Sequence, residues 1–171
     1  VVLGHGLTVI PEKCFSGCTS LENITLSDSL IRIENRAFEN CTSLKNIDLP
    51  DSLQTIGDHA FENCTSLKKI ILPELATDFE KHYGTLPEYE VVESIGVKAF
   101  CNCKSLEKLE FQSSDHILII GNCAFYGCES LKNLIIPGCV IKIGGSAFSN
   151  CKNLVEVTFL EPLSYEMFCN S

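Results

Sequence analysis

The chain has 171 residues, which is enough for one domain with its own core, and 45% of them are apolar. That apolar fraction excludes a disordered chain, and the net charge of −9 argues against a nucleic acid partner, whose affinity would come from phosphate neutralisation. No apolar run approaches the roughly 20 residues of a membrane helix, so we expect no membrane insertion by this segment.

One pattern recurs along the chain, at intervals of about 23 residues. A cysteine stands three positions after each phenylalanine, a leucine six positions after it, and further apolar residues nine and eleven positions after it. The chain is expected to open inside a strand, because Val1 and Leu3 fall where Ile24 and Leu26 fall one repeat later. A unit this short cannot bury its own apolar residues, so it is predicted to stack on copies of itself. The phenylalanines are Phe15, Phe38, Phe61, Phe100, Phe125 and Phe148.

Each repeat contains the signals of a strand and two turns. The end of Leu-x-x-Ile-x-Leu alternates with the period of a strand, and the prolines that follow it end the strand by lacking an N–H donor. Farther along, an Ile-Gly pair such as Ile56-Gly57 predicts a turn that needs positive φ or a close approach of two backbones. The segment Ala-Phe-x-Asn-Cys, as at 37–41, is predicted as one helical or 3₁₀ turn.

The unit is plainest from Ile56 to Pro73, where it reads Ile-Gly-x-x-Ala-Phe-x-Asn-Cys-x-Ser-Leu-x-x-Ile-x-Leu-Pro. It resembles the BspA-type leucine-rich repeat over nearly the whole chain, with departures at Gln112 and Leu160 in the proline position. The predicted fold class is therefore an α/β repeat, a right-handed leucine-rich-repeat solenoid with one short parallel strand and one short helical or 3₁₀ turn per ~23-residue repeat. The resemblance also implies display at the cell surface or secretion, and adhesion to a host or cell-surface protein.

We expect a single domain over residues 1–171, with six full repeats, partial repeats at both ends and an insertion at about 74–94. Neither end resembles a polar capping repeat, so we expect a fragment of a longer solenoid. No nucleophile, acid–base pair, metal cluster or cofactor loop is visible, so we predict no catalytic, metal or cofactor site. The predicted function is a non-enzymatic protein–protein interaction scaffold. The alternative is a structural spacer that projects another domain and has no ligand of its own.

The first candidate binding region is the insertion in the 39-residue interval between Phe61 and Phe100. Residues 74–94 hold six acids and one lysine, a net charge of −5, together with Phe79, Tyr83 and Tyr89. Clustered aromatic residues often anchor interfaces, and loops that are long for their setting are often functional. The alternative is loop growth that the solenoid tolerates.

The second candidate region is the face of the predicted sheet, because strand residues between the apolar positions point away from the core. A face of scattered charged and apolar residues that only contacts solvent is the alternative. The candidate protein-binding residues on this face are Lys45, Asp48, Lys68, Lys69, Ile71, Glu107, Lys108, Glu110, Lys132 and Ile135.

The cysteines and asparagines of the repeat are interpreted as structural. The six repeat cysteines are expected to be free and buried, and the other five offer no disulfide framework because their number is odd. Cys101-Asn102-Cys103 does not match zinc spacing. Asn23, Asn40 and Asn63 fit the glycosylation sequon, but Asn40 and Asn63 coincide with the repeat, where a turn asparagine is favoured over a glycan acceptor.

Overall fold

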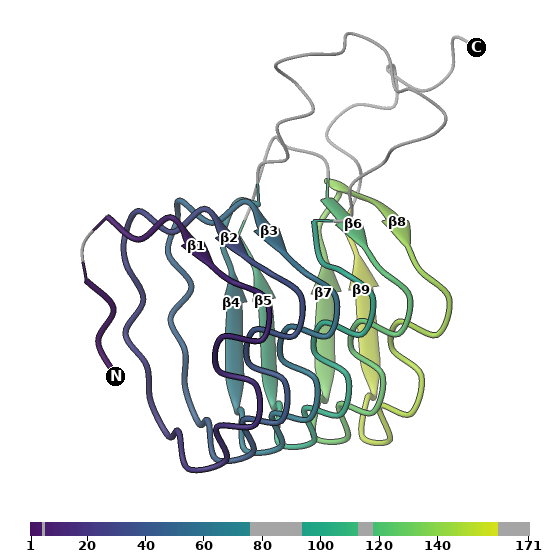
Figure 1. Cartoon of the computed structure of the whole chain (residues 1–171). Coiled ribbons are helices and arrows are strands. Elements are labelled where there is room, and N and C mark those ends of the chain that lie inside the picture. The colour runs from purple at the N-terminus through teal and green to yellow at the C-terminus, as the bar shows by residue number, and fades with distance from the viewer. Residues whose placement is uncertain (5, 76–93, 113–117, 161–171) are drawn as a thin grey trace, which may run out of the picture.

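The computed structural model describes residues 1–4, 6–75, 94–112 and 118–160. These residues wind into coils that stack along one axis, with parallel sheets on two sides of the stack (Figure 1). The first sheet contains β1 (Val9–Ile10), β2 (Arg32–Ile33), β3 (Thr55–Ile56), β6 (Leu118–Ile120) and β8 (Val140–Ile143). The other side holds two two-stranded parallel sheets, β4 (Lys69–Leu72) with β5 (Lys108–Phe111) and β7 (Asn133–Ile136) with β9 (Glu156–Phe159), which are together called the second sheet.

The strands of the second sheet lie where the repeat predicts a strand. β4 and β5 pair in parallel with Ile70 opposite Leu109, and β7 and β9 pair in the same way. Ile70 and Leu72 are buried, whereas Lys69 is exposed and Ile71 is half-buried. The period-two alternation of apolar residues therefore directs every second side chain into the coil, as the sequence indicates.

The first sheet corrects the prediction of one strand per repeat. β1, β2 and β3 pair in parallel, and isolated bridges through Ile95 join β3 to β6. Each coil thus has two strand positions, and the second coincides with the isoleucine that precedes the predicted turn. β1 to β3 are only two residues long, which is too short to show an alternating pattern in the sequence.

The helical turn of the predicted fold class is not confirmed, because the described residues contain no helix. Around each phenylalanine the chain instead forms tandem turns, such as those closed by Ala37 N–H to Glu34 C=O and Cys41 N–H to Phe38 C=O. Arg36 and Asn40 have φ of 58° and 61°, which interrupts any right-handed helix. The Phe38 N–H donates to Ala60 C=O of the next coil at 2.7 Å, so the turns stack by hydrogen bonding between coils.

The glycine after the isoleucine is needed for the close approach of two coils. A Cβ on Gly96 would lie 2.6 Å from the backbone nitrogen of Asp58, and one on Gly144 would lie 2.4 Å from that of Asn122. Neither glycine has a positive φ. The sequence leaves two reasons for this glycine open, a positive φ and a close approach of two backbones. The structure supports the close approach.

The core is a set of ladders that run along the solenoid axis. The six repeat phenylalanines form five stacked pairs, with ring centroids 5.0 to 5.3 Å apart and planes within 7° of parallel. The pair Phe61–Phe100 is as close as the others at 5.0 Å, although 39 residues separate them. The insertion therefore leaves the stack of coils unbroken.

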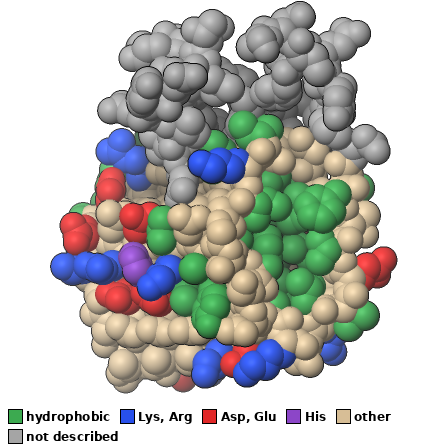
Figure 2. Space-filling view, turned by 90° about the vertical axis from the view of Figure 1, so that its right-hand side faces the viewer, with side chains coloured by type: hydrophobic (Ala, Val, Ile, Leu, Met, Phe, Trp, Pro, Cys, Tyr) green, Lys and Arg blue, Asp and Glu red, His purple; other side chains and the backbone are tan. Residues whose placement is uncertain are grey.

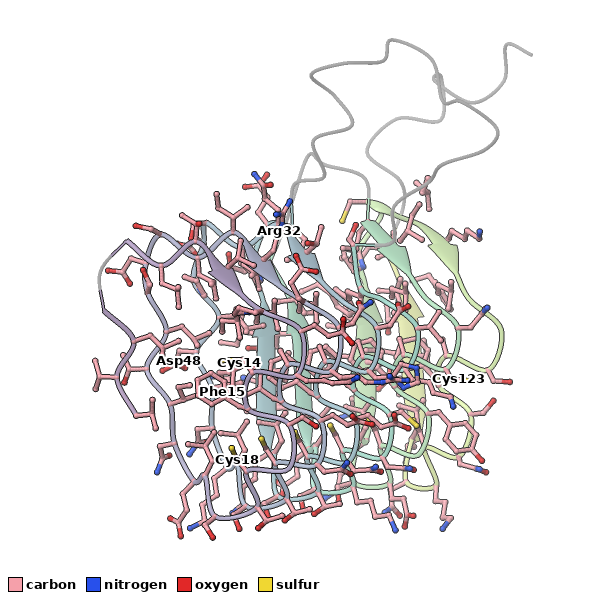
Figure 3. The ribbon with its side chains drawn as sticks, viewed as in Figure 1. Cys14, Phe15, Cys18, Arg32, Asp48 and Cys123 are labelled. Atoms are coloured by element: carbon pink, nitrogen blue, oxygen red, sulfur yellow. The ribbon has the colours of Figure 1, made fainter. Side chains whose placement is uncertain are left out.

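The repeat cysteines form a second ladder. The Cys103 Sγ donates to Phe61 C=O at 3.3 Å, and the Cys64 Sγ donates to Phe38 C=O at 3.2 Å. Burial raises the pKa of these thiols above its ordinary value. The first rung, Cys18, is exposed, which corrects the expectation of six buried cysteines. No described coil precedes Phe15 and Cys18, which lie at one end of the stack (Figure 3).

Apolar side chains are exposed at the opposite end of the solenoid. Figure 2 looks at the end where β8 and β9 lie and shows hydrophobic side chains gathered there. Val157 and Phe159 are 41% and 67% exposed, whereas Leu134 and Ile136 at the same positions one coil earlier are buried. Among the described residues, no further coil follows β9 to cover these positions.

Candidate protein-binding face

The second sheet places the predicted face residues in two outward rows. In the register of β4 and β5, Lys69 lies opposite Lys108, and Ile71 lies opposite Glu110. Ile135 on β7 continues the row of Ile71 and Glu110. Asp48 holds the same repeat position one coil before Ile71. The predicted residues that the structure describes therefore lie together on one face. Phe79, Tyr83 and Tyr89 are outside the described residues.

The four remaining predicted face residues each stand directly before a strand or bridge position. The Lys68 N–H donates to Lys45 C=O at 3.2 Å, and the Glu107 N–H donates to Lys68 C=O at 2.9 Å. Lys132 holds the same place before β7, where its carbonyl accepts the N–H of Val155 at 2.8 Å. All four side chains are exposed. They form a third row, beside the two rows of the strands.

Ion pairs engage two of the lysines on this face. Lys45 Nζ lies 2.8 Å from the Glu22 carboxylate on the preceding coil, and Lys108 Nζ lies 2.6 Å from that of Glu110 on its own strand. The hydrogen bond from Lys45 and its positive charge lower the pKa of the Glu22 carboxyl. Both pairs are solvent-exposed, so they contribute little to stability and remain open to exchange with a ligand.

A shallow hollow of about 120 Å³ lies on the face between β4 and the coil before it. Residues 47–50 of that coil form neither a strand nor a bridge, so the sheet is interrupted there. Its apolar lining comes from Ile47, Leu49 and Ile71. Its polar lining comes from Asn46, Asp48 (labelled in Figure 3), Lys69 and Gln112.

Sequence reasoning found part of this hollow. Asp48, Lys69 and Ile71 are among the predicted binding residues, but Leu49 and Gln112 are not. A signal for Gln112 existed, because it stands where a proline follows the strand in three other repeats. Leu49 holds a position that points into the core elsewhere, and only the irregular path of residues 47–50 brings it to the hollow.

The asparagines of the repeat have a structural role in the turns. Asn40, Asn63 and Asn102 all have positive φ, a conformation that asparagine tolerates well. The Asn63 Nδ2 donates to Asn40 Oδ1 at 2.9 Å, and the Asn102 Nδ2 donates to Asn63 Oδ1 at 3.1 Å. A glycan on Asn63 would occupy the nitrogen that makes the first of these hydrogen bonds. Asn23, by contrast, is exposed and forms an isolated parallel bridge with Asn46.

The described residues contain no group of three or more histidine, cysteine or acidic side chains arranged to hold a metal ion. In the same part of the chain, no helix is long and apolar enough to span a membrane.

Comparison with known proteins identifies the repeat. The BspA-type leucine-rich repeat region matches in six copies over residues 1–83 and 85–171. A leucine-rich repeat protein of T. pallidum (TpLRR) is 28% identical, with a TM-score of 0.59, and the match covers 94% of this chain and 69% of that one.

Two further solved structures are similar over smaller shares of their own length. A leucine-rich repeat protein from Bacteroides ovatus is 30% identical, with a TM-score of 0.56, and the match covers 86% of this chain and 39% of that one. The pneumococcal vaccine antigen PcpA is 23% identical, with a TM-score of 0.60, and shares the fold over 90% of this chain and 35% of its own. No curated protein sequence matches the chain.

Leucine-rich repeat proteins of this kind are typically scaffolds for protein interactions and typically lack enzymatic activity. The repeat match covers nearly every residue, and the stacked parallel sheets agree with it. The chain therefore belongs to the BspA-type leucine-rich repeat family.

Proposed function

We propose that the chain is a non-enzymatic recognition module of a cell-surface or secreted protein, and that it binds a protein partner on the face of its second sheet. The observation that carries the proposal is the hollow beside β4. Its lining combines three apolar residues with four polar ones, so a side chain of a partner could make both kinds of contact there.

The contrast between inward and outward positions supports this assignment. The inward positions of β4, β5, β7 and β9 all hold apolar residues, whereas one outward position of the same strands holds Ile71, Glu110, Ile135 and Thr158. Stacking requires only the inward residues. The outward residues are therefore free to serve recognition, and Ile135 is 58% exposed although it is apolar.

Surface display and adhesion rest on family membership, because BspA-type repeats are typical of cell-surface and secreted adhesins. The competing proposal is a spacer whose unbroken phenylalanine ladder only holds another domain at a distance. The two proposals differ in whether the second sheet takes part in binding.

The experiment measures binding of the purified chain to a panel of purified extracellular matrix and cell-surface proteins by surface plasmon resonance. The test variant is Ile71→Ser/Ile135→Ser. The matched control is Ile141→Ser, which changes an isoleucine that is 41% exposed on β8 of the first sheet. We expect the test variant to raise the dissociation constant at least tenfold and the control to leave it unchanged.

Equal binding by both variants would move the site away from the second sheet. Absence of binding to every panel protein, with circular dichroism showing a folded chain, would favour the spacer.

A further inference from the structure

We propose that the face binds an extended acidic and apolar segment of the partner, with carboxylates on Lys68 and Lys69 and one apolar side chain in the hollow. This deepens the proposed function and rests on it. The observation behind it is a cluster of four lysines, Lys45, Lys68, Lys69 and Lys108, called here the lysine cluster.

Backbone contacts hold the lysine cluster together across three successive coils. The Lys68 N–H donates to Lys45 C=O, and the Lys108 N–H donates to Lys68 C=O, both at 3.2 Å. Lys69 and Lys108 are direct neighbours in the parallel register of β4 and β5. Adjacent strands are about 4.8 Å apart, so the four lysine side chains extend from backbone positions that lie close together.

Only the outer members of the cluster have acidic partners. Glu22 pairs with Lys45, and Glu110 pairs with Lys108. Within the described residues, neither Lys68 nor Lys69 forms an ion pair, although Glu107 follows Lys68 in the same row. Two lysines without an ion pair among the described residues therefore remain at the centre of the cluster, in a chain whose net charge is −9.

Like charges placed directly opposite in a sheet destabilise it. Lys69 and Lys108 have this arrangement, which folding alone does not require because both positions face solvent. A carboxylate beside Lys69 would reduce this repulsion, and carboxylates at Lys68 and Lys69 would accept charge-assisted hydrogen bonds from both ammonium groups. The local charge therefore selects an acidic ligand.

The hollow adds the apolar requirement. Lys69 lines the hollow together with the apolar residues Ile47, Leu49 and Ile71. Because these three residues are aliphatic, an aliphatic side chain of a partner could pack against them. In an extended peptide, side chains alternate in direction at about 3.3 Å per residue, so a carboxylate and an apolar group two residues apart can reach the lysines and the hollow together.

The test uses a fluorescein-labelled peptide that repeats Glu-Ser-Leu-Ser, so that a glutamate and a leucine stand two residues apart on the same side, with fluorescence anisotropy as the readout on the full chain. Two comparison peptides replace leucine by serine or glutamate by lysine. The charge variant is Lys68→Glu/Lys69→Glu. Its control, Lys104→Glu/Lys142→Glu, makes the same change in net charge with exposed lysines that lie outside the lysine cluster.

We expect the glutamate–leucine peptide to bind with an affinity that falls at least threefold between 50 and 300 mM salt, because the charges are exposed. Each comparison peptide should bind at least tenfold more weakly. The charge variant should lose at least tenfold in affinity, and its control should not. Equal affinity for the glutamate and lysine peptides, or an unaffected charge variant, would overturn the inference.

The outcome is separable from that of the proposed function. A protein partner whose binding depends on Ile71 and Ile135 but is unaffected by Lys68→Glu/Lys69→Glu would support the face and refute the acidic ligand. If the peptide binds at the lysine cluster but no protein of the panel binds, the result would support an acidic and apolar ligand and show that the panel lacks the partner.

Discussion

Phe61 shows how much one residue contributes to a stack of coils. Its ring lies between those of Phe38 and Phe100, at centroid distances of 5.1 and 5.0 Å, and the side chain is fully buried. The sequence predicted this environment, because a phenylalanine that recurs in phase with the repeat must face the same interior in each coil.

Phe61→Ala is expected to lower the free energy of unfolding by about 3–5 kcal/mol, since it removes a buried ring and leaves a cavity between two coils. Urea denaturation followed by circular dichroism would measure the loss. Phe15→Ala is the control, because Phe15 is half-buried and stacks on one neighbour only. A loss below about 1 kcal/mol for Phe61→Ala would contradict the ladder as the main source of stability.

Gly96 tests the close approach of successive coils. Its substitution by alanine would place a Cβ 2.6 Å from the backbone nitrogen and from the side-chain oxygen of Asp58, so the coils would have to separate. We expect Gly96→Ala to cost about 1–3 kcal/mol of stability. Gly4→Ala is the matched control, since no atom lies within 4 Å of the added Cβ and its φ is not positive. Equal effects of both substitutions on the urea midpoint would show that the close approach of the coils at Gly96 does not determine the loss of stability.

At the scale of elements, the sequence predicted the second sheet but not the first. The strand around Ile70 is visible because apolar residues alternate over several positions, whereas the strand at Ile33 has one buried residue. Pairing of the first sheet depends on hydrogen bonds between residues 23 apart, which appear only when the coils stack. For the same reason, the hollow beside β4 could not be predicted, because it arises where residues 47–50 leave the ladder.

The insertion can be tested as a separate element. Leu75 and Ser94 at its two ends are buried, and Ser94 C=O accepts the N–H of Ile56 at 3.0 Å, so both residues should be retained. We expect replacement of residues 76–93 by a short glycine–serine linker to change the free energy of unfolding by less than about 1 kcal/mol, because loop length has a weak effect on stability. Calorimetry would check this.

The same deletion variant tests the aromatic cluster of Phe79, Tyr83 and Tyr89. If these residues anchor the partner, the variant should remain folded and bind it more weakly in the surface plasmon resonance assay. Binding as strong as that of the intact chain would confine recognition to the second sheet.

The whole molecule combines many buried thiols in one stack, and this gives it a specific response to alkaline pH. Burial raises the pKa of Cys41 and of Cys101 to about 11, and it raises the pKa values of Cys64, Cys103 and Cys128 as well. In the unfolded chain, the same thiols lose their protons near their ordinary pKa of 9.0. The contribution of these thiols to stability is thus fully present below about pH 9 and is lost above it.

The sign follows from proton binding. Between about pH 9 and 11 the native state retains protons that the unfolded state has released, so the free energy of unfolding falls with rising pH, by about 1.4 kcal/mol per pH unit for each thiol. Guanidinium denaturation in a reducing buffer at pH 7.5, 9 and 10.5 should show little change over the first step and a steep loss over the second. Lysine and tyrosine also titrate in this range, so the control is Cys64→Ala/Cys103→Ala, which keeps those groups and removes two buried thiols. Its stability should start lower at pH 7.5 and fall less steeply above pH 9, whereas parallel curves for the two chains would show that the buried thiols do not determine the alkaline limit.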